Sequence, residues 1–180
     1  ERPSLTPLTL ENEFRWAAVW LRHHVQRLNS HIILRQQLQT HVLVGEYGAA
    51  LAQIDDHCQT KGWSLWAVEL RSALVQHTYG TTAMRSWLSD LQDQVPNKTP
   101  GLLFAIFQDR NDEQYQFETI DRNCKESFPR FRNVAPWFVE YLEYRTLGRI
   151  ENPTTAIPRI LSRDITSSLI DYYESVIYTA

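Results

Sequence analysis

The stretch Gly45–Leu51, with the sequence GEYGAAL, constrains the fold more than any other part of this chain. Apolar residues recur at spacings of three and four on both sides of it, which predicts two amphipathic helices. Gly45 permits a tight turn between them, and Tyr47 opens the second helix. The stretch therefore predicts a helical hairpin, and repeated helical hairpins usually present binding surfaces.

The same helical spacing continues along the chain. Thr9 and Ser64 are predicted helix caps, Gly62 and Gly80 are predicted stops, and Asn29-Ser30 is predicted to end the first helix. Six glycines are too few for the turns of a sandwich or barrel, so the predicted fold is all-α. The apolar stripes that predict helices are Leu10–Leu28, Ile33–Leu43, Tyr47–Cys58, Leu65–Leu74, Met84–Val95, Phe117–Cys124, Phe138–Leu142 and Ile165–Ile177.

The segment 96–101 is the clearest loop and divides the prediction into a helical region 1–95 and a second helical region 102–180. The apolar spacing alone does not establish that residues 102–128 are helical throughout. Within them, Leu102–Phe107 is assigned to a helix because no partner strand is evident. Asp109–Glu113 is expected to be a solvated turn. The end of the chain has the sequence of an interrupted helix, so we expect the chain to be part of a longer protein.

Residues Leu34–Gly62 resemble one hairpin of the tetratricopeptide-type helical repeats, in which a Gly-acidic-Tyr turn precedes a small residue and Leu. In that resemblance Tyr47 fills the groove between two helices and Ala50 allows their close approach. Leu38 and His57 stand where that family places small residues. The resemblance implies a short array of stacked hairpins that binds proteins, and an irregular helical bundle is the alternative.

Charge, hydropathy and cysteine content bear on the partners and the cellular compartment of the chain. The net charge of −3 gives no general attraction to nucleic acid, and no apolar run reaches the length of a membrane span. Two cysteines, Cys58 and Cys124, are no disulfide framework, so a reducing cytoplasm is expected.

Arg71 and His77 form the candidate catalytic pair. Their spacing resembles the Arg-x(4–6)-His motif of HEPN-type ribonucleases, which implies a phosphate-holding Arg and a proton-transferring His across a dimer. A surface Arg and a His that suits a helix C-terminus are the alternative interpretation.

A basic-aromatic cluster is the candidate site for RNA or phosphate. Its members, interleaved with Phe128 and Phe131, are Arg122, Lys125, Arg130 and Arg132. Such a pattern can hold phosphates and stack bases, and a charge-mixed surface around two core phenylalanines is the alternative.

Trp63 and Trp87 are the candidate binding anchors, because tryptophan is enriched where binding energy concentrates. Packing into the core is the alternative interpretation, and it is the favoured one for the Trp63-Ser64-Leu65-Trp66 stretch. No histidine pair has a recognised metal-ligand spacing, and no motif for a cofactor is present. We therefore expect a scaffold for another protein, or for another part of its own longer chain, rather than an enzyme. Cleavage of RNA by Arg71 and His77, and RNA or phosphate binding by the basic-aromatic cluster, are the alternatives.

Overall fold

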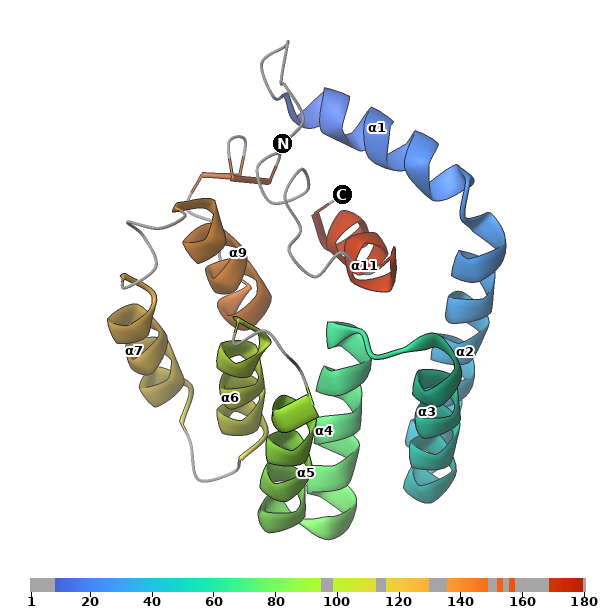
Figure 1. Ribbon diagram of the computed structural model, residues 1–180, viewed down its shortest axis with the longest axis vertical. Helices are drawn as coiled ribbons and strands as arrows, with labels where there is room; N and C mark the ends of the chain where they lie inside the picture. The colour runs from blue at the N-terminus through green and yellow to red at the C-terminus, as the bar shows by residue number, and fades with distance from the viewer. Residues whose placement is uncertain are drawn as a thin grey trace. The chain divides into compact units, whose positions relative to one another are not determined.

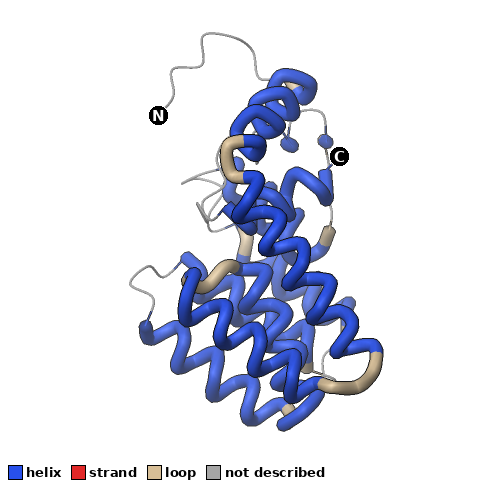
Figure 2. Tube along the Cα trace, turned by 90° about the vertical axis from the view of Figure 1, so that its right-hand side faces the viewer, coloured by secondary structure: helices blue, strands red, loops and turns tan. Residues whose placement is uncertain are grey.

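All labelled secondary structure in the described part of the chain is helical (Figure 2), which confirms the predicted all-α class. The computed structural model describes residues 9–94, 99–112, 116–129, 136–148, 152–153, 156–157 and 169–179. The helices, labelled in Figure 1, are α1 Leu10–Arg22, α2 Val25–Leu43, α3 Tyr47–Lys61, α4 Leu65–Tyr79, α5 Thr81–Gln94, α6 Thr99–Asn111, α7 Phe117–Ser127, α9 Pro136–Leu147 and α11 Leu169–Thr179.

The chain forms two compact units. Unit 1 contains Glu1–Ser30 and Lys125–Ala180, and unit 2 contains His31–Cys124. Helices α2 and α7 each contribute residues to both units. The predicted division at residues 96–101 does not coincide with these boundaries, and Thr99–Gly101 belong to α6 rather than to a loop. A proline is tolerated there because the first turn of a helix needs no partner for its N–H groups.

In unit 2, helix α3 packs against α4, α4 against α5 and α6, and α5 against α6 (Figure 1). The expected hairpin turn is present at Gly45, whose φ is 81°. The Glu46 N–H donates to the His41 carbonyl at 2.8 Å, which satisfies a carbonyl left over at the end of α2. The Glu46 carboxylate also lies 2.8 Å from His41 Nδ1. Ala50, one turn further on, is completely buried.

The core of unit 2 is made of aliphatic and aromatic side chains from each of its helices. Its buried apolar members are Leu34, Leu38, Ala50, Leu51, Ile54, Cys58, Leu65, Ala67, Val68, Leu74, Val75, Met84, Leu88, Leu91, Phe104, Ile106, Phe107, Ile120 and Cys124. The predicted caps and stops are confirmed here: Ser64 Oγ accepts from the Ala67 N–H at 3.2 Å, and Gly62 and Gly80 both end helices at a φ of 84°.

In unit 1, α1 packs against α11. The small core there contains Ala17, Ile157 and Val176. The Tyr144 hydroxyl of α9 donates to the Ser175 carbonyl of α11 at 3.4 Å. The packing partner of α1 in this unit is therefore the C-terminal helix.

Two predicted boundaries were wrong. The first helix ends at Arg22 instead of Asn29-Ser30, because the chain turns at His23 and His24 and then continues as α2. Asn29 and Ser30 stay helical because both are exposed and the Ser30 hydroxyl donates to the Gln26 carbonyl at 3.0 Å.

The expected turn at Asp109–Glu113 was also wrong in part, since α6 runs to Asn111. Asp112 is buried, not solvated, because Arg85 of α5 supplies an opposite charge 2.5 Å from its carboxylate. Residue 113 lies outside the described residues.

Candidate functional site

Four side chains from helices α3, α4 and α5 and from the α3–α4 connection meet in unit 2, and we call them the Trp–Arg cluster. They are Asp55 of α3, Trp63 at the junction of α3 and α4, Arg71 of α4 and Trp87 of α5. The Arg71 guanidinium carbon lies 4.3 Å from the Trp87 ring centroid and 6.0 Å from that of Trp63. The two indole centroids are 5.6 Å apart and tilted by 52°. One cation therefore lies within cation–π range of two aromatic rings.

The guanidinium is also held by a two-point ion pair. Arg71 Nε donates to Asp55 Oδ1 at 2.5 Å, and Nη2 donates to Oδ2 at 3.1 Å. Such a fork fixes the orientation of the guanidinium as well as its position. The Arg71 side chain is 17% exposed and that of Asp55 34% exposed, so the pair is only partly shielded from water. Several contacts thus hold the guanidinium at once, and the Arg71–Asp55 pair has no net charge.

The local backbone explains why Trp63 lies in this position. Gly62 ends α3 with a positive φ, and Ser64 caps α4, so Trp63 lies in the short connection between the two helices. Its side chain is 39% exposed, whereas that of Trp87 is half-buried. Both candidate anchors from the sequence thus belong to one cluster, and Trp63 is the more exposed of the two.

Arg71 and His77, the candidate catalytic pair, contact different partners. Arg71 contacts Asp55, Trp63 and Trp87, whereas the exposed His77 ring packs edge-on against Tyr47, with centroids 4.2 Å apart. A phosphate at Arg71 would have to share the guanidinium with Asp55. RNA cleavage by this pair stays a prediction.

The basic-aromatic cluster is described only in part. Arg122 and Lys125 are exposed on α7, but Arg130, Phe131 and Arg132 lie outside the described residues. Phe128 is 1% exposed, so its ring offers no face for a base to stack on. Phosphate binding by the four basic residues also stays a prediction.

A second polar set joins α4, α5 and α6. Arg110 Nη1 donates to Glu69 Oε1 at 2.9 Å, and Asn111 Nδ2 donates to the buried Ser72 Oγ at 2.8 Å. Burial raises the pKa of Asp109 on α6; Asp112 adds to the effect, while Arg85 opposes it. The bonds to Glu69 and Ser72 join α6 to α4, and the ion pair of Arg85 with Asp112 joins α5 to the end of α6, so this set is structural.

Two further titratable side chains, Cys58 and His57, lie on α3 near the cluster. Burial raises the pKa of the Cys58 thiol to about 12, with Asp55 adding to the effect. A thiol with such a pKa is protonated at neutral pH and is a poor nucleophile. Burial also lowers the pKa of His57, aided by His31 and Lys61. No group of three or more His, Cys, Asp or Glu side chains among the described residues is arranged to hold a metal ion.

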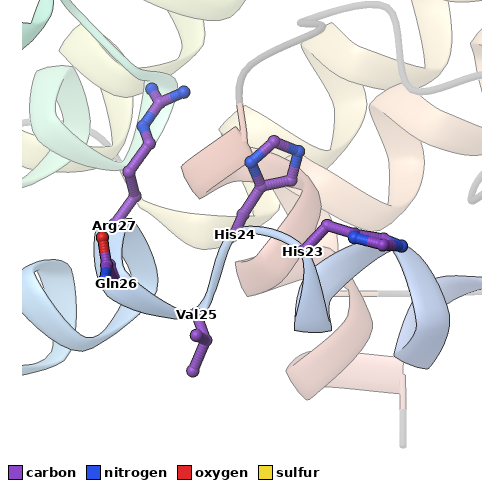
Figure 3. A pocket seen from close by; sticks show the side chains of 5 residues that line it. All are labelled: His23, His24, Val25, Gln26 and Arg27. Carbon is purple, nitrogen blue, oxygen red and sulfur yellow. The ribbon is translucent and has the colours of Figure 1, made fainter.

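A hollow of about 440 Å³ lies at the turn between α1 and α2 (Figure 3). Its lining residues are His23, His24, Val25, Gln26 and Arg27. His23 and His24 project in different directions (Figure 3), so their rings do not converge on one ligand. All five residues come from one short stretch of chain, which makes the hollow a feature of the turn.

Comparisons with protein-family models, curated proteins and solved structures gave no match. The tetratricopeptide resemblance of residues 34–62 therefore stays a prediction from its own residues. None of the described helices has the length and apolar character needed to cross a membrane.

Sequence reasoning missed two of the charged groups that organise unit 2, namely Asp55 and Asp112. Their partners lie 16 and 27 residues away along the chain. The only sequence signal was that Asp55 shares helix α3 with the buried Ile54 and Cys58, so it flanks a packed face. That signal does not say which cation lies opposite.

Proposed function

We propose that this chain is a helical scaffold that binds another protein, or another part of its own longer chain, and that the Trp–Arg cluster is its docking surface. The observation that carries the proposal is the half-exposed indole of Trp63, which is supported by Arg71 and Trp87. Trp and Arg are enriched among the residues that contribute most to binding between proteins.

The preordered geometry of the cluster favours this role. A side chain that is already fixed loses less conformational entropy when a partner binds, so more of its contact energy appears as affinity. Arg71 is fixed by two hydrogen bonds to Asp55, and its guanidinium in turn lies against both indoles. The partner would thus meet an ordered apolar surface with a polar edge.

The charge of the cluster indicates the class of partner. Asp55 neutralises Arg71, so the surface has no net positive charge with which to attract phosphate groups. A protein segment that offers an apolar or aromatic side chain fits better than a nucleic acid. Both cysteines are free and buried, which fits the reducing cytoplasm that the sequence favours.

The stacked-hairpin interpretation belongs to the same proposal. It is supported by the turn at Gly45, by the complete burial of Ala50, and by the packing of α3 on α4. An array of hairpins offers extended surface on its outer helices, as repeat scaffolds do.

The test is a quantitative affinity capture with the chain immobilised. Three versions are compared: the parent, Trp63→Ser, and Tyr79→Ser as a control that removes another exposed aromatic side chain of unit 2. Thermal unfolding first establishes that all three are folded. We expect at least one protein to be retained by the parent and by Tyr79→Ser and lost by Trp63→Ser. Capture of no protein, or of the same proteins by all three versions, contradicts the proposal.

A further inference from the structure

Helix α1 packs one apolar face against its own unit and leaves two apolar side chains exposed on another side. Leu10, Phe14 and Leu21 pack with Ala17 against the core of unit 1. Trp16 and Val19 lie on the roughly opposite side of the helix, because successive residues are rotated by about 100°. Trp16 is 65% exposed and Val19 49% exposed.

Trp20 borders this second face but is partly held by its own unit. Its ring contacts Tyr172 of α11 at 4.9 Å and His24 at 4.8 Å, both edge-on. Trp16 and Val19 are thus the centre of the exposed apolar face. Large apolar side chains that are exposed together are typical of a contact surface.

The charges beside this face are arranged in opposite signs along the helix. Glu11 lies in the first turn and Arg22 in the last, and the rotation per residue places both on the same flank of Trp16 and Val19. The Glu11 carboxylate accepts from Arg15 Nη2 at 2.6 Å, but both side chains are more than 70% exposed. Such a solvated pair is weak, so it does not prevent Glu11 from meeting another cation.

We propose that the exposed face of α1 binds α1 of a second copy of this chain, with the two helices antiparallel about a twofold axis. In an antiparallel pair each flank meets its own counterpart, so Glu11 lies opposite Arg22 of the second copy, and Arg22 opposite its Glu11. The same register brings Trp16 within about 3 Å, along the helix axis, of the level of Val19 of the second copy, which is within reach of an indole side chain. One helix face is thus complementary to itself in both charge and apolar contact.

A second copy fits this face better than a membrane does. An interfacial helix would carry mainly basic residues beside its apolar face, whereas the first turn of α1 carries Glu11 and Glu13. A 13-residue helix is only about 20 Å long, so the contact falls among the small interfaces. The dimer is therefore weak, and it forms at high concentration or when further contacts add to it.

Sedimentation of the parent chain from about 5 to about 500 µM tests the dimer, since small interfaces give affinities in or above the micromolar range. The parent is expected to shift from monomer to dimer across this range. Trp16→Glu should remain monomeric throughout. Leu43→Glu is the control, because Leu43 is 86% exposed in unit 2, and it should dimerise as the parent does. Circular dichroism establishes that the variants are folded.

Charge reversal tests the antiparallel register. Glu11→Arg alone and Arg22→Glu alone each place like charges opposite one another and should weaken the dimer at least threefold. The double variant restores opposite charges at both ends and should recover most of the parent affinity. A parent that is monomeric at every concentration, or a dimer that survives Trp16→Glu, overturns the proposal. A double variant no tighter than the single variants overturns the register, and binding of the monomer through Trp16 to phosphatidylcholine vesicles assigns the face to lipid instead.

Discussion

Arg71 shows how the role of a residue in this chain depends on its neighbours. Its position six residues before His77 resembles a catalytic motif, but the structure places its guanidinium beside the indoles of Trp63 and Trp87 and against Asp55. A guanidinium held in this way is a structural cation that orders the aromatic surface around it.

A double-mutant cycle measures how strongly Asp55 and Arg71 are coupled. Asp55→Asn and Arg71→Met should each destabilise the chain, because each leaves one partly buried polar group without its partner. Partial exposure limits the coupling free energy to about 1–2 kcal/mol. Urea unfolding of the parent, the two single variants and the double variant gives this value. A coupling below about 0.5 kcal/mol would mean that the pair does not fix the guanidinium.

The sequence predicted members of the site but not their arrangement. Trp63 and Trp87 stood out by residue type, and Arg71 by its spacing to His77. The contact that unites them depends on the register between α3, α4 and α5, and helical periodicity says nothing about register between helices. For the same reason Asp55 could not be recognised as the partner of Arg71.

Among the helices, the boundaries that depend on a cap or a glycine stop within a few residues were predicted correctly. Ser64 and Gly62 act through bonds and backbone angles within a few residues, and both behave as predicted. Asn29-Ser30 is polar but can remain helical when its side chains face solvent, so polarity alone did not end the helix. The break at His23 and His24 contains no glycine or proline, so the sequence did not predict it.

Substitution of Ala50 tests the close packing of α3. Ala50 is completely buried, so Ala50→Trp must displace neighbouring side chains, at a cost of about 1–3 kcal/mol or more in the free energy of unfolding. Ala49→Trp is the matched control, because Ala49 is exposed on the same helix and should change stability by less than about 0.5 kcal/mol. Equal unfolding midpoints for the two variants would show that α3 is not packed through Ala50.

Asp109 gives α6 a stability that depends on pH. Its folded-state pKa is raised, chiefly by burial, so the folded chain holds the proton more tightly than the unfolded chain does. Stability from this group is therefore present at low pH and is lost as the pH rises through its folded pKa. Asp109→Asn should stabilise the chain at pH 7, and the gain should shrink as the pH falls toward the ordinary value of 3.8.

Chemical unfolding of the parent and Asp109→Asn between about pH 4 and pH 7 measures this effect. Asp90→Asn serves as the control, because Asp90 is exposed on α5. A variant that is less stable than the parent at pH 7, or a gain that does not change with pH, would contradict the assignment.

At the scale of the whole molecule, the two units present different surfaces. Unit 2 carries the Trp–Arg cluster on packed helices, and unit 1 carries the exposed face of α1. The all-α class was predictable because helical spacing and the scarcity of glycine act along the entire chain. The division into units was not, because unit 1 joins the first helix to the last, and contacts between distant segments leave no periodic trace in the sequence.

Calorimetry with a partner identified by capture shows whether the Trp63 indole anchors it, when the parent is compared with Trp63→Ser. Loss of an anchor indole at a binding surface costs about 2 kcal/mol or more, so we expect the dissociation constant to rise about 30-fold or more. Tyr79→Ser should bind as the parent does. A folded Trp63→Ser chain that binds the partner with the parent's affinity would contradict the assignment of the Trp–Arg cluster as the docking surface.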